Sequence, residues 1–264
     1  MGSLQDRTFY LVLTALGGFV LLFIIAPLLG MVLHSSPADI VKTVAEQEVR
    51  TSILLTLGVS LSATLFMAIP AIGLAWLLAR KDFPLKRVIT AVIDLPIVIP
   101  HSAAGIAVLG IISRDSLIGS LGNHLGIEFV SSAAGIAVAM AYVSLPFLVN
   151  AAREGFHSVP ERLEKAALNL GASPVRMFLT ISLPLAWRSI LAGLVLMWAR
   201  GMSEFGAVIV VAYHPMVTPV LIYERFGSYG LQYARPVAVI FVGVCLAAFM
   251  LMRLLVRQDH HASR

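Results

Sequence analysis

Long uninterrupted runs of apolar residues dominate the chain, and polar residues gather between them. A helix needs about 20 mostly apolar residues to cross the hydrocarbon core of a bilayer. Six segments approach or exceed that length, so we predict six transmembrane helices. They cover Thr8–Leu33, Thr51–Ala79, Leu95–Ser113, Phe129–Ala152, Ser189 to about Ala212 with Arg200 and Glu204 inside, and Pro236–Met252.

The first run differs from a cleaved secretion signal. It is longer than the apolar core of such a signal, which is about 7–15 residues, and no convincing small-residue cleavage site follows it. We therefore expect the first helix to be retained.

The composition strengthens the prediction of a membrane protein. Hydrophobic residues make up 59% of the 264 positions and charged residues only 12%, whereas a soluble domain carries about 25% charged residues. These values argue against nucleic-acid-binding modules, cytosolic enzymes, disulfide-stabilised scaffolds and disordered chains. We expect an all-α polytopic protein, one transmembrane domain over residues 1–264, with lipid and not nucleic acid around it.

The basic residues predict the orientation. With the N-terminus in the cytoplasm, thirteen of the 19 Lys and Arg residues fall on the cytoplasmic side and five on the other, which favours cytoplasmic placement of both termini. The thirteen are Arg7, Arg80, Lys81, Lys86, Arg87, Arg153, Arg162, Lys165, Arg176, Arg188, Arg253, Arg257 and Arg264. The five are Lys42, Arg50, Arg114, Arg225 and Arg235, and Arg200 lies within a span.

Sequence motifs for catalysis and for cofactors are missing. The chain has no phosphate-binding G-x-x-x-x-G-K-[ST] loop, no H-E-x-x-H zinc motif and no G-x-S-x-G nucleophile motif. His101 and Ser102 are adjacent, and adjacent side chains on a helix point about 100° apart, so they do not form a nucleophile–base pair. We expect no enzyme activity, no metal and no cofactor in this chain, and any ATP is expected to be hydrolysed by another subunit.

The longest hydrophilic stretch, residues 153–188, has the pattern of a helical cytoplasmic loop. Ser158, Pro160 and Glu161 predict a helix start with a capping box, and Gly171 predicts its end. A second short helix is predicted from Ser173. Between them Leu163, Ala166, Ala167 and Leu170 form a short apolar stripe, which either rests on the protein's own helices or docks into a groove on a partner.

This loop resembles the permease subunits of ATP-binding-cassette (ABC) importers. That family carries E-A-A-x-x-x-G and, after nine further residues, I-x-L-P. The matching residues are Ala166, Ala167, Gly171, Ile181, Leu183 and Pro184, while Lys165 replaces the family's Glu and Glu164 lies one position earlier. The resemblance implies a type I ABC importer permease fold with a coupling helix that sits in a cleft of the ATPase. The implied ATPase-coupling residues are Leu163, Glu164, Lys165, Ala166, Ala167, Leu170, Gly171, Ala172 and Ser173.

Two further stretches resemble oxyanion permeases, above all those for molybdate and tungstate, with sulfate and thiosulfate permeases as the alternative. They are Asp94–His101 and Trp198–Ala207. The resemblance implies a second copy of the chain, two ATPase subunits that bind ATP and magnesium, and an extracytoplasmic oxyanion-binding protein that sets most of the selectivity. A rival from another class is a secondary transporter driven by an ion gradient.

Proline and charged residues point to a polar pathway through the membrane. Pro96 and Pro100 either kink the third span, freeing carbonyls beside His101 and Ser102, or Pro100 simply marks a helix entry.

In the fifth span Arg200, Ser203 and Glu204 are predicted on one helix face, because charges facing lipid are costly. They either form a structural ion pair or border the outer end of the pathway as a gate. Gly201 and Gly206 are then expected to let two copies of this helix approach.

Overall fold

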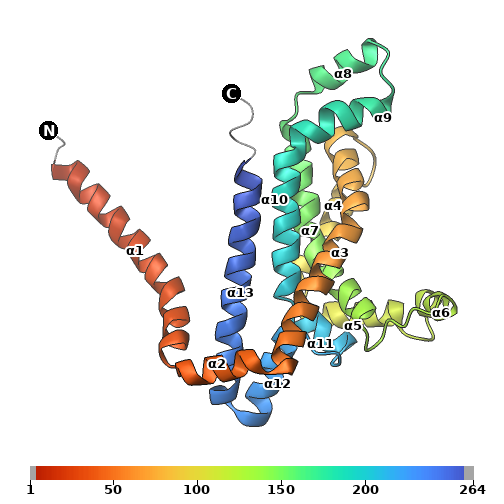
Figure 1. The fold of residues 1–264 in the computed structure, drawn as a ribbon. Coiled ribbons are helices and arrows are strands. Elements are labelled where there is room, and N and C mark those ends of the chain that lie inside the picture. The colour runs from red at the N-terminus through yellow and green to blue at the C-terminus, as the bar shows by residue number, and fades with distance from the viewer. Residues whose placement is uncertain (1–3, 259–264) are drawn as a thin grey trace.

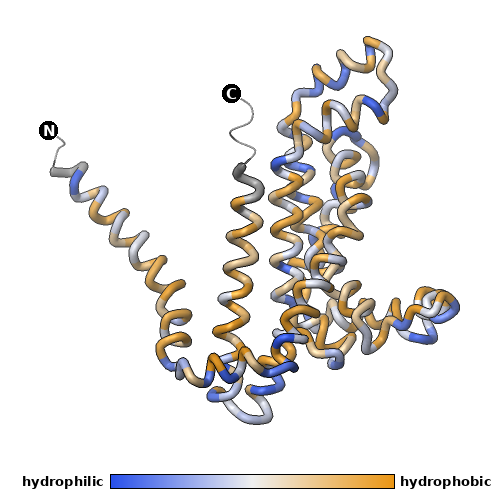
Figure 2. The backbone as a smooth tube through the Cα atoms, viewed as in Figure 1, coloured by the Kyte–Doolittle hydropathy of each residue, from blue (hydrophilic) through white to orange (hydrophobic). Residues whose placement is uncertain are grey.

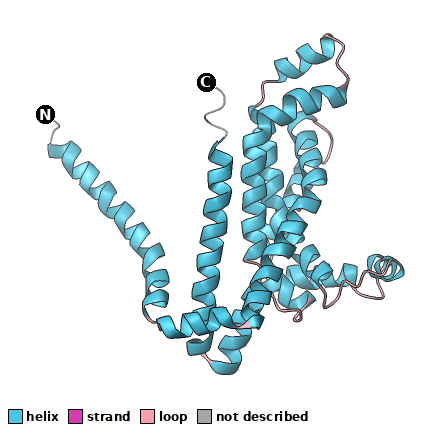
Figure 3. Ribbon diagram, in the orientation of Figure 1, coloured by secondary structure: helices cyan, strands magenta, loops and turns pink. Residues whose placement is uncertain are grey.

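The computed structural model describes residues 4–258, and all regular elements within that range are helices (Figures 1 and 3). The long helices are α1 (Leu4–Leu33), α3 (Gln47–Arg80), α7 (Ala133–Ser158), α10 (Leu183–Met202) and α13 (Leu231–Gln258). The short ones are α2 (Pro37–Ala45), α4 (Lys86–Val98), α5 (His101–Ile112), α6 (Leu117–His124), α8 (Glu161–Asn169), α9 (Pro174–Met177), α11 (Gly206–Val211) and α12 (Thr218–Tyr229), with a π-helical turn, η1 (Phe178–Ser182), before α10.

The core of the bundle lies around α7, which packs against both α3 and α10. Leu148 and Phe156 of α7 and Ile190 of α10 are fully buried there. Side chains at the contact are small: a Cβ at Gly193 would lie 2.9 Å from the Cβ of Ala151. Small residues let helix backbones approach closely where lipid provides no hydrophobic drive for association.

The two ends of the bundle differ in what they carry. One end of the bundle, called the α8 end, carries α8, the connection from α3 to α4, the start of α1 and the last described residues of α13 (Figure 1). The other end, called the α12 end, carries α2, α11 and α12. Hydrophobic residues cover the long helices, and hydrophilic residues concentrate towards the ends (Figure 2). This arrangement matches the grouping of loops predicted from the basic residues, of which Arg264 lies outside the described residues.

Five continuous helices in residues 4–258 are long and apolar enough to cross a membrane: Arg7–Leu33, Gln47–Arg80, Ala133–Ser158, Pro174–Met202 and Leu231–Met252. The predicted third span, Leu95–Ser113, has a wrong start, whereas the break expected from its prolines is present. It begins earlier, at Lys86, and α4 and α5 meet at a bend of 115°. A helix of the length of α4 covers only about 20 Å, so a sixth span requires both halves of the bent pair.

Pro100, for which the sequence allowed either a kink or a helix entry, lies at the bend. Pro100 is the N-cap of α5, with extended backbone, and Ile99 ends α4. Proline has no N–H to continue the α4 hydrogen bonds, but it fits the start of a new helix. Pro100 therefore both breaks the helical path, as the kink interpretation expected, and marks the entry to α5, whereas Pro96 is buried inside α4 without ending it.

The predicted fifth span has wrong limits at both ends. The helical path starts at Pro174, continues through α9 and η1, and stops at Met202. Pro184 does not end it, because the wider π turn that precedes it accommodates a residue without an N–H. Much of the predicted loop 153–188 is thus part of long helices, and the connection between them is residues 159–173.

The first helix stands apart from the rest (Figure 1). Its side chains from Arg7 to Leu29 are exposed, and the C-terminal end of α1 contacts the bundle mainly through α13. There Arg235 donates a hydrogen bond to the carbonyl of His34 at 2.6 Å. An apolar cavity of about 450 Å³ lies between α1, α12 and α13.

Candidate functional site: a charged cluster and a loop helix

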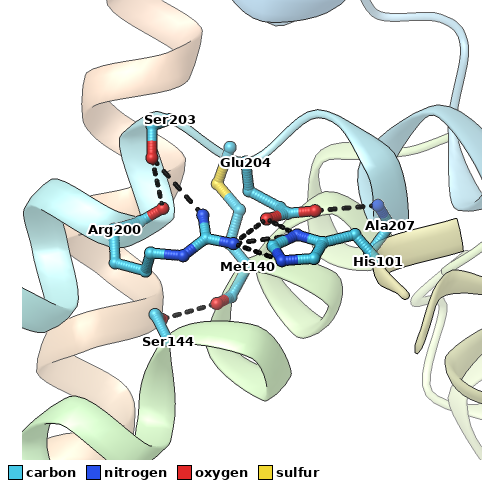
Figure 4. Close-up of polar contacts among 7 residues, drawn as sticks. All are labelled: His101, Met140, Ser144, Arg200, Ser203, Glu204 and Ala207. Atoms are coloured by element: carbon cyan, nitrogen blue, oxygen red, sulfur yellow. Dashed lines mark hydrogen bonds and ion pairs between the residues drawn. The ribbon is translucent and has the colours of Figure 1, made fainter. Parts of the chain in front are cut away.

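A cluster of charged side chains lies where α10 stops, at the α12 end (Figure 4). Arg200 occupies the last turn of α10, and Glu204 follows in the connection to α11. The Arg200 Nη2 atom lies 2.8 Å from Glu204 Oε2. The sequence predicted both residues on one face of a continuous helix, and this is wrong because α10 ends at Met202. The two side chains nevertheless form an ion pair.

Glu204 is the centre of this Arg200 cluster, which comprises His101, Arg200 and Glu204. The residue is only 1% exposed. Its Oε1 accepts the backbone N–H of Ala207 at 2.8 Å, and its Oε2 contacts both Arg200 and His101 Nδ1 at 2.8 Å. A buried carboxylate is stable only when it is paired and hydrogen-bonded, and these three contacts fulfil that requirement.

His101 joins the cluster because α5 begins at the bend. Its Nδ1 lies 2.8 Å from Glu204 Oε2, and Arg200 Nη2 lies 2.8 Å from Nδ1 and 3.0 Å from Nε2, so the imidazole ring contacts both members of the ion pair. The His101 side chain is 39% exposed and that of Arg200 22% exposed. The cluster therefore has a buried acidic centre and a partly open basic side.

The other residues predicted for the pathway differ in their relation to this cluster. Ser203 contacts Arg200, whose Nη1 donates to the hydroxyl at 3.3 Å. Ser102 is exposed and makes none of the hydrogen bonds that hold the cluster. Gly201 faces Ser60 of α3, and a Cβ at Gly206 would lie 2.6 Å from that of His101. These glycines allow close packing within the chain, and their expected role between two copies stays a prediction.

The loop helix α8 lies at the opposite end of the bundle (Figure 1). Most of its apolar stripe is exposed: Leu163 is 41% and Leu170 89% exposed and Ala166 is exposed, whereas Ala167 is half-buried. Lys165 is also exposed and pairs with Glu161 at 2.8 Å, and this pairing lowers the pKa of Glu161. The apolar stripe is therefore available to another molecule.

The limits of α8 agree only in part with the prediction. Gly171 has φ +87°, a left-handed conformation that favours glycine, and Ser173 caps α9 through the N–H of Arg176. The expected capping box is wrong, because Ser158 belongs to the last turn of α7 and the N-cap of α8 is Pro160. Ala172 and Ser173 form the connection to α9.

Glu164 is the exception among the implied coupling residues. It is 6% exposed, and its carboxylate points into the chain rather than towards a partner. Arg80 Nε, at the end of α3, donates to Oε2 at 2.8 Å, and the Ser182 hydroxyl donates to Oε1 at 2.6 Å. Glu164 is the carboxylate that lies one position away from the Glu of the family pattern. This departure could have marked Glu164 as unusual, but it did not indicate Arg80 or Ser182 as its partners.

A second polar pair inside a span also escaped the sequence analysis. The Asn150 amide of α7 donates to the Asp94 carboxylate of α4 at 2.6 Å. The buried carbonyl oxygen of Asn150 has no hydrogen-bond partner among the described residues. Because the predicted span begins at Leu95, Asp94 was expected at its edge, where a carboxylate needs no partner inside the membrane.

Comparison with known proteins relates the chain to transport proteins. Residues 71–258 match the family described as "binding-protein-dependent transport system inner membrane component". The molybdate/tungstate transport system permease protein WtpB of Thermococcus kodakarensis is 43% identical over 96% of this chain and 97% of its own length. The probable sulfate transport system permease protein cysT of Chlorokybus atmophyticus is 32% identical over 86% of this chain and 82% of its own length.

Solved structures support the fold. A bacterial ABC transporter involved in the import of the acidic polysaccharide alginate contains a chain that matches with a TM-score of 0.75 and 19% identity, over 97% of both chains. A chain of the MetNI methionine ABC transporter matches with a TM-score of 0.62 and 16% identity, over 80% of this chain and 95% of that one. The helical arrangement is thus that of ABC importer permeases.

Proposed function

Since the chain belongs to the family of binding-protein-dependent transport system inner membrane components, we propose that it is the permease subunit of an ABC importer for molybdate or tungstate. The observation that carries the choice of anion is the identity of 40–43% with three molybdate/tungstate permeases over nearly the whole chain. Sulfate permeases match at about 30–32% identity and make sulfate or thiosulfate the alternative.

ATP is hydrolysed by separate subunits in this proposal. The sequence has no phosphate-binding loop, and the exposed stripe of α8 suits docking into a groove of an ATPase. This chain holds no cofactor, whereas each of two ATPase subunits binds ATP and magnesium. The family likeness favours this machine over a secondary transporter driven by an ion gradient.

A second copy of the chain completes the membrane part. A twofold pair is the commonest oligomer and presents two α8 helices to two ATPase subunits. The exposed α1 and the apolar cavity beside it offer a surface for the second copy. The translocation pathway then lies between the two copies.

The α8 end faces the cytoplasm, and both termini lie on that side. The excess of basic residues in the connections at this end supports the orientation. The Arg200 cluster then lies near the outer face, where an extracytoplasmic binding protein releases the anion. Arg200 attracts the anion through the guanidinium donors that Glu204 and His101 leave available, and Glu204 holds the guanidinium in place.

Uptake into proteoliposomes tests the proposal. The permease is co-expressed with its neighbouring ATPase and supplied with binding protein loaded in turn with molybdate, tungstate and sulfate. We expect ATP-dependent uptake of molybdate and tungstate and little uptake of sulfate. Uptake by a permease that carries no ATPase, or uptake driven by a proton gradient alone, would contradict it.

A further inference from the structure

Glu164 is a buried acid on an otherwise exposed helix. Leu163 of α8 and Leu170, which caps its end, are exposed, whereas this carboxylate is covered by the chain. Burial of a carboxylate is unfavourable unless strong partners compensate it. A residue placed against the usual preference needs an explanation beyond the helix's own stability.

Its partners come from the two helices that flank the bundle core. Arg80 is the last residue of α3 and is also held by the Val159 carbonyl, to which its Nη2 donates at 2.9 Å. Ser182 ends η1 and leads directly into α10. One carboxylate therefore joins α8 to α3 and to α10, and we call Arg80, Glu164 and Ser182 the Arg80 junction.

An aromatic cluster fixes the same region of the bundle. Phe178 of η1 packs edge-on against Trp76 of α3, with ring centroids 5.6 Å apart, and lies 6.0 Å from Phe156 of α7. Such pairs prefer particular geometries, so they resist sliding of η1 against its neighbours. The turn that carries Ser182 is thus itself held to α3 and α7.

The covalent connections of α8 are short irregular segments. It is joined to α7 through Val159 and Pro160 and to α9 through residues 170–173. Such segments bend easily unless side chains brace them. We propose that Glu164 is the positioning residue that makes α8 move as one body with α3 and α10, and that it does not contact the ATPase; this inference rests on the proposed function.

The test compares variants in proteoliposomes that contain the complete transporter. Three quantities are measured: the amount of permease, the ATPase that co-purifies with it, and the ATP hydrolysed per anion imported. Glu164→Ala removes the hydrogen bonds to both Arg80 and Ser182. Glu164→Gln keeps one acceptor oxygen and the shape of the side chain. Ser182→Ala removes only the hydrogen bond from η1. Asp82→Asn is the matched control, because Asp82 lies two residues from Arg80 and its ion pair with Lys86 is exposed.

The expected results separate positioning from mere stability. Glu164→Ala lowers the amount of permease, because Arg80 is left buried without its carboxylate, but the ATPase bound per permease stays within about twofold of the parent. The ATP consumed per anion rises about tenfold, the size expected for losing a charged hydrogen-bond network. Glu164→Gln and Ser182→Ala raise it about threefold, and Asp82→Asn leaves it unchanged.

Three outcomes would overturn the inference. One is an unchanged ATP-to-anion ratio in Glu164→Ala. Another, if Glu164→Ala fails to fold, is an unchanged ratio in Ser182→Ala. The third is equal loss of bound ATPase in the Ala and Gln variants, which would make Glu164 a partner contact. A parent protein that binds no ATPase would instead overturn the proposed function, and with it this inference.

Discussion

The Arg200 cluster and the Arg80 junction use the same chemistry at opposite ends of the bundle. Each buries a glutamate carboxylate 2.8 Å from an arginine nitrogen, and each adds a third side chain from a distant segment. They differ in exposure. Arg200 and His101 are 22% and 39% exposed, whereas the Arg80 side chain is 6% exposed and Ser182 is fully buried.

The difference in exposure allows the two regions different roles. The open basic side of the Arg200 cluster can meet an anion that arrives from water, since arginine keeps donors that its partners do not use. The Arg80 junction has no such open side and can only hold helices together. An ion pair by itself therefore does not reveal a binding site, and the accessibility of its cation is what distinguishes the two regions.

The largest effect is expected from Arg80→Met. It leaves Glu164 buried with Ser182 as its remaining partner, and breaking a buried pair in this way costs about 3–5 kcal/mol. We expect a clearly lower midpoint of thermal unfolding in detergent. The double variant Arg80→Met/Glu164→Leu should recover most of the loss, because an apolar pair replaces the ionic one. If Arg80→Met had the same midpoint of thermal unfolding as the parent protein, the buried ion pair would not stabilise this junction.

Arg200→Met is expected to have the next largest effect, on transport rather than on folding. Glu204 keeps His101 and the Ala207 N–H as partners, so the permease still assembles with the ATPase. Uptake should fall about 100-fold, as expected for loss of charge-assisted contacts to the anion. Failure to assemble, together with full transport by Arg200→Met/Glu204→Leu, would show that the pair is structural and that the two regions do not differ in function.

Changes within α8 and just after its end should uncouple ATP hydrolysis from uptake without disturbing either ion pair. Ala167→Glu places a charge on the apolar stripe, and Gly171→Val puts a β-branched residue at φ +87°. Each should lower uptake per ATP hydrolysed about tenfold, while the thermal midpoint stays near that of the parent. Gly171→Asn is the matched control, because asparagine tolerates the left-handed conformation. Normal coupling in both variants would mean that α8 does not dock on the ATPase.

The smallest effect is expected from His101→Gln. The ion pair of Arg200 and Glu204 remains, and glutamine can replace one hydrogen bond of the imidazole, so uptake should fall only about threefold. The control is His124→Gln, since His124 is an exposed histidine at the same end of the bundle. A loss as large as that of Arg200→Met would make His101 a principal contact of the anion.

Some features of the fold follow from the sequence because they depend on local physics. The length of apolar runs against the bilayer locates the membrane helices, and basic residues group the connections. Gly171 and Ser173 mark a helix end and a helix start, because these residue types suit those backbone positions. The loop pattern around Ala166 and Ala167 also identified the family, which its match to the family model supports.

Tertiary structure alone decided which residues meet. His101 and Glu204 are 103 positions apart, and Arg80 and Glu164 are 84 apart. Apolar periodicity reports which face of a helix is buried, but it does not report which helix covers that face. The 115° bend after α4 and the π turn before Pro184 arise where proline cannot continue an α-helix, and packing selected a new helix at one and a wider turn at the other. These two choices set where α5 and α10 begin, and thereby bring His101 to Glu204 and Ser182 to Glu164.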